Sequence, residues 1–406
     1  MHGETETVVR ILLYDTSAHG PPWPLFLQAL DSMTKIKSRR YAYRFFDEAA
    51  FLERKAIGNR ALTRALDWLT INVKHRRTRM LAYEAAARFL KYQRHPVRYA
   101  DLNRRLVEEA RAFGPQIVLI VMGFHILPET LRTIKSETGA TLINYATDDP
   151  FNERTSRQNV REAIPVYDVY ACTKRAIIND VTRAGCSNVQ YVRFGYQPSL
   201  HFVETALTSK EQNRFTADVA FVGEGDGDRL PFFTALTKAI PDLKLALYGG
   251  LWGLSPTLRR YHRGTVRGRD LRLALGSAKI AVNLVRMQNR DDHVMRSFEG
   301  PACGAFMLNE RTKEHLALFA EGREAAYFES PEELVQKTRY YLDNEEEREQ
   351  IREAGWQKTT VGGHTYDDRL TEILVTAERR PSRLDDPADR IYPNPLVIDR
   401  ALTRDS

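Results

Sequence analysis

The stretch that decides the fold is Arg296-Ser-Phe-Glu-Gly-Pro-Ala-Cys-Gly-Ala-Phe-Met-Leu308. It predicts a short helix placed directly before an apolar strand. A helix that begins near Ser297 would present unpaired N–H groups and the positive end of its dipole. With Arg296 beside it, this end suits a phosphate group, and Glu299 in the first turn could accept sugar hydroxyls. The alternative is a capped helix in which Glu299 only favours the dipole.

Outward from this stretch, expected strands and helices alternate along most of the chain. In the first half the expected strands are 7–15, 41–46, 116–122, 140–146, 166–171 and 189–194, with helices at 23–35, 128–138 and 174–184. In the second half the expected strands are 217–222, 243–248, 279–285 and 305–308, with helices at 231–240, 270–277, 297–303, 331–342 and 345–356. This alternation predicts an α/β protein with two Rossmann-like, doubly wound parallel sheets facing a cleft. The loops after the carboxyl ends of the strands should form the site.

The length of 406 residues favours two domains over one. We expect an N-terminal domain at 1–196 and a second domain at 197–364. Residues 365–406 are expected to form a C-terminal helix and tail that return toward the first domain.

The net charge of +7 is unevenly spread. Between Arg54 and Arg105 there are 14 Lys or Arg and three acids, so this segment carries +11 and the rest of the chain −4. It belongs to an expected helical insertion at 54–110 of the first domain. The segment 54–105 fits peripheral contact with an anionic membrane, a polyanionic acceptor or nucleic acid, of which nucleic acid is the least expected. Solvated helix faces around an apolar stripe are the alternative.

The sequence shows no sign of membrane insertion or export. It has no apolar run of about 18 residues, and its first seven residues carry acids without an apolar core. Cys172, Cys186 and Cys303 are scattered and form no CxxC pair, which argues against a disulfide framework. A cytoplasmic protein is therefore expected.

Several loops carry candidate chemistry, each with an ordinary alternative. Gly223 to Arg229 is a glycine-rich loop after a strand, which could approach phosphate, although its acids would have to point away. Residues 263–268 could offer backbone groups to a base edge or form a plain turn. Asp148 and Asp149 end a strand, where a carboxylate could act as a base, bind sugar, hold a metal or only start a turn. No clear metal-ligand spacing occurs, and none is expected.

In order along the chain, these pieces resemble the CgeB-like glycosyltransferases, a branch near the group 1 enzymes of the GT-B fold. The segments that carry the resemblance are 145–150, 188–202, 217–229, 248–252, 264–268, 278–283, 296–308, 314–334 and 364–369. The resemblance covers roughly 115–375 well and the first strand weakly.

The resemblance implies a metal-independent transfer from a nucleotide-sugar, a UDP-, GDP- or dTDP-sugar, to a glycan, lipid-linked or protein acceptor. The nucleotide-sugar is a substrate, and no cofactor is expected. The implied donor-binding residues are Gly223, Arg229, Gly249, Trp252, Val266, Gly268, Asn283, Arg296, Ser297 and Glu299. Asp148, Asp149 and Glu299 are the implied catalytic residues, and Gly20 and His125 would lie on the acceptor side.

The sequence departs from the group 1 pattern at one position. Those enzymes often carry two Glu separated by seven residues, and here the first of the two is Asp291, a shorter acid. Transfer of a hexose or related sugar with retention is expected more than inversion, but this departure leaves the outcome open. A nucleotide-sugar epimerase, a non-catalytic glycan- or nucleotide-binding protein and a nucleic-acid binder are the alternatives.

Overall fold

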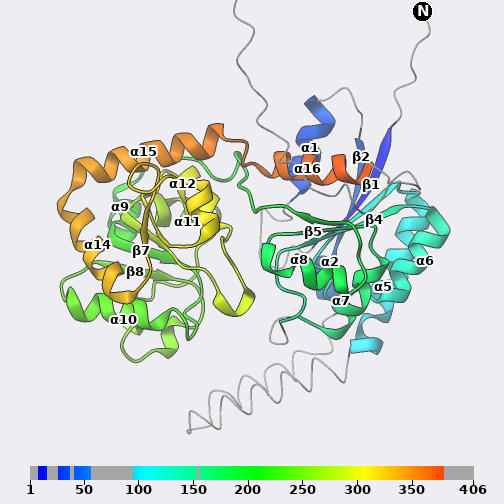
Figure 1. Cartoon of the computed structure of the whole chain (residues 1–406), viewed down its shortest axis with the longest axis horizontal. Coiled ribbons are helices and arrows are strands. Elements are labelled where there is room, and N and C mark those ends of the chain that lie inside the picture. The colour runs from blue at the N-terminus through cyan, green and yellow to red at the C-terminus, as the bar shows by residue number, and fades with distance from the viewer. Residues whose placement is uncertain (1–7, 16–25, 37–40, 56–94, 153–155, 379–406) are drawn as a thin grey trace, which may run out of the picture.

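The computed structural model describes residues 8–15, 26–36, 41–55, 95–152 and 156–378. Within this part of the chain, the first sheet has six parallel strands in the order β2-β1-β3-β4-β5-β6. Its strands are β1 (Val9–Asp15), β2 (Tyr41–Asp47), β3 (Ile117–Val121), β4 (Thr141–Ala146), β5 (Val169–Cys172) and β6 (Val189–Tyr191). This sheet forms the right-hand domain in Figure 1.

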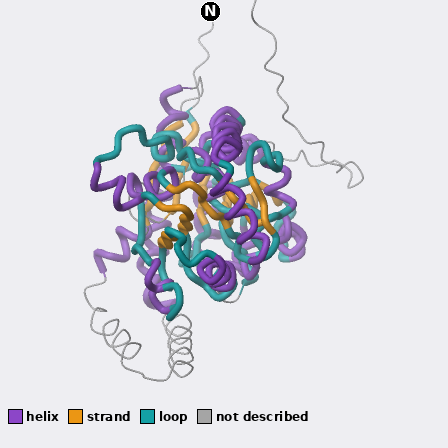
Figure 2. Tube along the Cα trace, turned by 90° about the vertical axis from the view of Figure 1, so that its left-hand side faces the viewer, coloured by secondary structure: helices purple, strands orange, loops and turns teal. Residues whose placement is uncertain are grey.

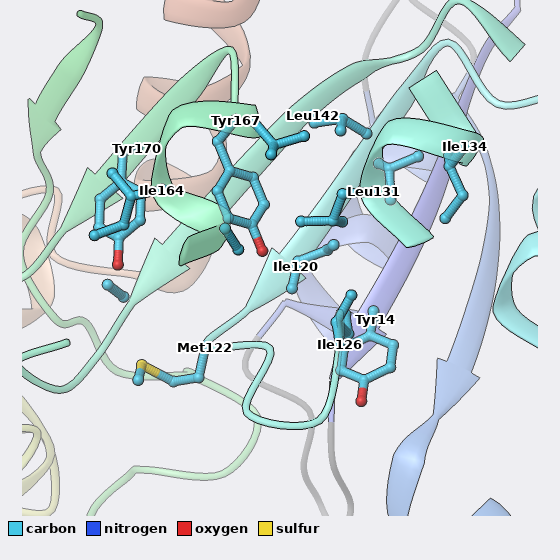
Figure 3. Packing of buried hydrophobic residues seen from close by; sticks show 14 of the residues in the cluster. Tyr14, Ile120, Met122, Ile126, Leu131, Ile134, Leu142, Ile164, Tyr167 and Tyr170 are labelled. Atoms are coloured by element: carbon cyan, nitrogen blue, oxygen red, sulfur yellow. The ribbon is translucent and has the colours of Figure 1, made fainter. Parts of the chain in front are cut away.

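Both faces of the first sheet are buried, as expected for strands that alternate with helices. Its helices are α1 (Leu27–Ile36), α2 (Glu48–Lys55), α5 (His95–Phe113), α6 (Pro128–Thr138), α7 (Gln158–Ala163) and α8 (Ile178–Arg183). Successive residues of β1 serve opposite faces: Leu12 packs with Leu106 and Leu131 on one side, and Ile11 and Leu13 belong to the cluster on the other. Figure 3 shows part of the first cluster, which extends to the loop between Met122 and Ile126.

The second sheet, also parallel, has five strands within the described residues, in the order β11-β10-β9-β7-β8. They are β7 (Ala217–Val222), β8 (Leu245–Tyr248), β9 (Ala278–Asn283), β10 (Met307–Glu310) and β11 (Ala326–Phe328). The helices of this half are α9 (Ser209–Phe215), α10 (Leu230–Ala239), α11 (Gly268–Gly276), α12 (Arg296–Ala302), α13 (Lys313–Leu318), α14 (Pro331–Asp343) and α15 (Glu345–Val361). Seen end-on, the strands of this domain lie between helices (Figure 2).

The chain crosses between the two domains twice, and the two crossings pair with each other. Tyr196 donates its backbone N–H to the carbonyl of His364 at 3.0 Å, and its own carbonyl accepts the N–H of Tyr366 at 3.0 Å. Gly195 allows this approach, because a Cβ there would lie 2.8 Å from the His364 carbonyl oxygen. The second crossing leads into α16 (Tyr366–Glu378), which lies against α1 on the first domain (Figure 1).

The predicted fold class is confirmed, while some elements differ from the sequence predictions. The strand expected at 166–171 is β5, which begins three residues later because residues 164–166 form a 3-10 turn containing Pro165. Strand β11 and helix α9 were not predicted; α9 is fixed by a capping box between Thr208 and Glu211.

The basic insertion is described only at its edges, because residues 56–94 lie outside the described part. In α5, Arg104 pairs with Asp101 at 2.9 Å, and Arg105 pairs with Glu108 at 3.3 Å and with Glu109. No helix among the described residues is long and apolar enough to cross a membrane.

Helix α16 should stabilise the first domain although it follows the second. Leu370 is fully buried among Ile11, Phe26 and their neighbours, so Leu370→Ala should lower the free energy of unfolding by about 2–5 kcal/mol. Val375→Ala on the same helix, where the side chain is exposed, is the matched control and should cost under about 0.5 kcal/mol. Urea titration checks both values, and equal losses would contradict the packing role of α16.

Candidate functional site

Each sheet contains a switch point, where the chain turns from building one side of the sheet to building the other. In the first sheet this point lies between β1 and β3, and in the second between β7 and β9. Ligands of open α/β sheets bind outside the carboxyl ends of the strands at such points. The candidate site therefore consists of the loops that follow these strands and their neighbours.

At the second switch point, Arg229 ties two loops together. Its guanidinium donates to the carbonyl of Glu224 at 3.1 Å and to that of Leu284 at 3.0 Å, which closes the glycine-rich loop against the end of β9. Arg229 is buried, and burial lowers its pKa. Little of the Arg229 side chain is therefore exposed in this structure for the predicted contact with the diphosphate.

Arg286, which was not among the residues predicted from the sequence, is a second cation at this switch point and is more exposed than Arg229. It follows β9 and lies 3.4 Å from a carboxylate oxygen of Glu224 and 3.6 Å from one of Asp226. Ion pairs of this length near the surface contribute under about 1 kcal/mol. The guanidinium of Arg286 can therefore exchange these carboxylates for the oxygens of a ligand at small cost.

Gly223 and Gly249 bring the ends of β7 and β8 into contact. Gly249 has a φ of +126°, and a Cβ on it would lie 2.2 Å from the carbonyl oxygen of Gly223. The same carbonyl accepts the indole N–H of Trp252 at 2.8 Å. Trp252 is fully buried in the core, and its contact with a donor stays a prediction.

The segment 264–268 lies beside the end of β8, because Gly249 donates its N–H to the carbonyl of Gly264 at 2.9 Å. Val266 is buried against Tyr248 and Leu271, and among the described residues its backbone N–H and C=O have no hydrogen-bond partner. Gly268, with a φ of +52°, begins α11. This segment has the unpaired backbone groups that base recognition needs, and its role stays a prediction.

Glu299 lies in the interior of the second domain. Its side chain is fully buried, pairs with Arg296 of the same helix and lies 3.5 Å from Nε2 of His201. Arg296, which is partly exposed, also interacts with Tyr366 at the second crossing. No surface of the Glu299 carboxylate is open to a ligand in this structure, and its contact with donor hydroxyls stays a prediction.

Ser297 and Asn283 belong to a second buried network beneath α12. The Ser297 hydroxyl lies 2.8 Å from Nε2 of His315, and it accepts N–H donors from Val294 at 3.1 Å and from Asn283 at 3.2 Å. Asn283 also donates to Asn309 at 3.0 Å. The chain itself occupies these groups in this structure, and the phosphate site at this helix end stays a prediction.

The loop between β9 and α12, residues 284–295, reaches the first domain and is called the interdomain loop below; it projects between the domains in Figure 1. Arg290 donates to both oxygens of Asp149, at 2.6 and 2.9 Å, and to Asp180 at 2.6 Å. Asn289 accepts the backbone N–H of Asp149 at 2.9 Å and donates to Asp148 at 2.9 Å. The loop thus reaches the predicted catalytic carboxylates.

The two acids at the end of β4 differ in what they can do. Asp149 is buried, and its oxygens are taken by Arg290 and by the N–H of Phe151 at 2.8 Å. Asp148 is partly exposed, and its second carboxylate oxygen has no hydrogen-bond partner among the described residues. Asp148 is therefore the acid that remains able to contact a substrate.

A buried ion pair lies directly behind these acids. Lys174, at the end of β5, is 1% exposed and contacts Asp291 of the interdomain loop at 2.8 Å. It also donates to the carbonyl of Thr147 at 2.6 Å. Asp291, the acid at the first position of the expected Glu pair, thus binds the other domain, and burial raises its pKa.

The acceptor-side predictions have mixed outcomes. Gly20 lies outside the described residues. His125 follows β3, its Nδ1 lies 2.7 Å from Glu48, and its ring stacks on Tyr99 at 4.0 Å between centroids. The hydroxyl of Tyr14 binds the other oxygen of Glu48. These groups gather at the first switch point, and their role stays a prediction. Among the described residues no group of three or more His, Cys, Asp or Glu could hold a metal ion.

Two observations place this architecture among known folds. The chain has the GT-B fold: it resembles HepE of Anabaena in complex with UDP-glucose (TM-score 0.56, 13% identity, 91% of this chain and 98% of that one). It also resembles sucrose-phosphate synthase of Thermosynechococcus elongatus (TM-score 0.60, 10% identity, 91% and 98%). A putative UDP-N-acetylglucosamine 2-epimerase of Listeria monocytogenes shares the fold as well (TM-score 0.53, 12% identity, 92% and 95%).

The second observation concerns the sequence. Residues 229–375 match the model of a family described as "Glycosyl transferase-like". This match includes the interdomain loop, α12 and most of α16. A search of curated proteins gave no match. The narrower CgeB-like resemblance stays a prediction.

Buried histidines should make the protein sensitive to mild acid. Burial lowers the pKa of His315 to about 4 and, with Arg296 and Arg272 nearby, that of His201 to about 3. Unfolded histidine has a pKa near 6.5, so the unfolded chain binds the proton first. The stability that each neutral ring contributes is present above that value and is lost as the pH falls, by roughly 1 kcal/mol per histidine between about pH 7 and about pH 5.5.

The measurement is urea unfolding at both pH values. His315→Gln, which keeps a donor and an acceptor, should reduce the fall in unfolding free energy between the two pH values by roughly 1 kcal/mol. His262→Gln, at a partly exposed histidine, is the control for the substitution itself. Equal pH dependence in the wild type and in His315→Gln would contradict the assignment.

Proposed function

We propose that this protein is a glycosyltransferase that moves a hexose or related sugar from a nucleotide-sugar to a glycan, lipid-linked or protein acceptor. The observation that carries the proposal is the family match over 229–375, which falls on the second switch point of a GT-B fold. The solved relative HepE binds UDP-glucose, which supports a UDP-sugar as the first donor to test.

In this proposal the donor nucleotide occupies the second domain. The base would meet the backbone of Val266, and the diphosphate would lie near Arg286 and the start of α10. As the bond from the sugar C1 to the phosphate oxygen breaks, negative charge develops on the leaving diphosphate. The guanidinium of Arg286 and the positive dipole end of α10 would stabilise this charge. Asp148 would face the sugar from the first domain. We propose that no metal or other cofactor takes part.

A thermal-shift screen with UDP, GDP, dTDP, ADP and CMP tests the donor site. A nucleotide at 100 times its dissociation constant should add about 2.7 kcal/mol of stability. If none raises the melting temperature, the transferase proposal fails. With the nucleotide found, the matching sugar should be transferred or slowly hydrolysed, and EDTA should leave the rate unchanged. Conversion of the nucleotide-sugar to an epimer without acceptor would instead indicate an epimerase, and the anomeric configuration of the product decides between retention and inversion.

Arg286→Gln should weaken binding of the nucleoside diphosphate by about tenfold, because one charge-assisted contact is lost. The monophosphate should bind almost equally to both proteins, because it lacks the phosphate nearest to Arg286. Arg323→Gln, at an exposed arginine of the same domain, is the matched control. Isothermal titration measures these affinities; an unchanged diphosphate affinity in Arg286→Gln would remove Arg286 from the donor site.

We also propose a cytoplasmic protein that contacts an anionic membrane through residues 54–105. Sedimentation with vesicles that contain anionic lipid should show binding at low salt and release at high salt, because exposed charges are screened. Absence of binding at low salt would contradict the membrane contact and leave the donor site untouched.

A further inference from the structure

Asn289 of the second domain is buried at the end of β4 in the first domain, with both polar atoms of its side chain hydrogen-bonded. Its Oδ1 accepts the backbone N–H of Asp149 at 2.9 Å. Its Nδ2 donates to Asp148 at 2.9 Å and to Asp291 at 3.1 Å. This orientation of the amide is the consistent one, because a backbone N–H must face oxygen and carboxylates must face N–H groups.

The surroundings of Asn289 explain why an uncharged donor is needed there. The carboxylates of Asp148 and Asp291 face its amide, and the carboxylate of Asp149 belongs to the residue whose backbone N–H the amide accepts. Arg290 neutralises Asp149, and Lys174 neutralises Asp291. Asp148 has no ion pair among the described residues, so the Asn289 amide is the group that holds its side chain.

The backbone that carries Asp148 is held from two sides, so the amide has a fixed partner. Lys174 donates a hydrogen bond to the carbonyl of Thr147 at 2.6 Å. The N–H groups of Thr147 and Asp148 donate to the sulfur of Met122, at 3.0 and 3.3 Å. Met122 has a φ of +57°, a strained conformation for a non-glycine residue, which often occurs at functional sites. With the backbone fixed, Asn289 sets where the second oxygen of Asp148 points.

We propose that Asn289 is a positioning residue for catalysis: it orients Asp148 toward the transferring sugar, so the carboxylate is set only when the two domains meet. This inference rests on the proposed function. Asp148 would touch the sugar, whereas Asn289 would act through Asp148 alone. The donor domain would thereby complete the acceptor-side half of the site.

The test compares Asn289→Ala, Asn289→Asp and Asp148→Asn, with Gln288→Ala as the matched control. Gln288 neighbours Asn289, is exposed, and directs its side chain to Asp228 of its own domain at 3.4 Å. UDP and UDP-glucose are the probes. Asn289→Ala should lower kcat about tenfold or more while UDP affinity and KM change less than about threefold. Added to Asp148→Asn, it should cause no further loss.

Asn289→Asp gives a readout that a purely structural role would not move. An additional negative charge beside Asp148 disfavours its ionised form, so the acidic limb of the kcat profile should move to higher pH, by roughly one unit. The ion pairs of Asp149 with Arg290 and of Asp291 with Lys174 are unchanged in this variant. When Asp148→Asn is added, the shift of the acidic limb should disappear.

Each outcome separates this inference from the proposed function. If UDP binds and the wild type turns over, but Asn289→Ala keeps its kcat and pH profile, the positioning role is overturned and the transferase stands. Loss of UDP affinity in Asn289→Ala, or a loss of kcat in Gln288→Ala equal to that in Asn289→Ala, would indicate a general effect of the loop. Either result would overturn the positioning role. Melting temperatures test the contact without activity: the decreases in Asn289→Ala and Asp148→Ala should combine to less than their sum, and full additivity would overturn the proposal even if no nucleotide bound.

Discussion

The backbone pairing of the two interdomain crossings is the constraint on which the rest of the structure depends. Tyr196 exchanges hydrogen bonds with His364 and Tyr366, and Arg369 adds a bond to the carbonyl of Phe194 at 3.0 Å. These bonds fix the two crossings to each other. In the same arrangement the interdomain loop, which follows the carboxyl end of β9, reaches the residues that follow the carboxyl ends of β4 and β5.

The contacts that the interdomain loop makes at the ends of β4 and β5 are polar. The Lys174–Asp291 pair is almost fully buried, and burial of charge costs several kcal/mol per ion before the partner compensates. Such a pair adds little net stability, but it penalises every misaligned arrangement, since either charge alone would be buried unpaired. Polar interfaces between domains also separate more readily than apolar ones. The same contacts can therefore specify one closed arrangement and still allow opening.

The parallel sheets could be predicted from the sequence because apolar strands alternate with helices at regular spacing. The three-residue strand Ala326–Phe328 was missed because it is too short to show a period. The site was harder. Glu299 follows Arg296 at a helix start and reads as a ligand group, yet its partner His201 lies about a hundred residues earlier. Asn289 carries no motif, and its function depends on a contact with Asp148, 141 residues away. Local patterns do not encode such pairings.

Helix α16 gives the first domain a particular order of assembly during synthesis. The helix covers part of one face of the first sheet beside α1, packing Tyr366 and Ile373 against strands made from the beginning of the chain. While the ribosome is still producing the second domain, the part of that face under α16 has no cover, and its apolar side chains are open to other chains and to chaperones. The first domain is therefore finished last, and a nascent chain that stalls before residue 366 would carry an open core.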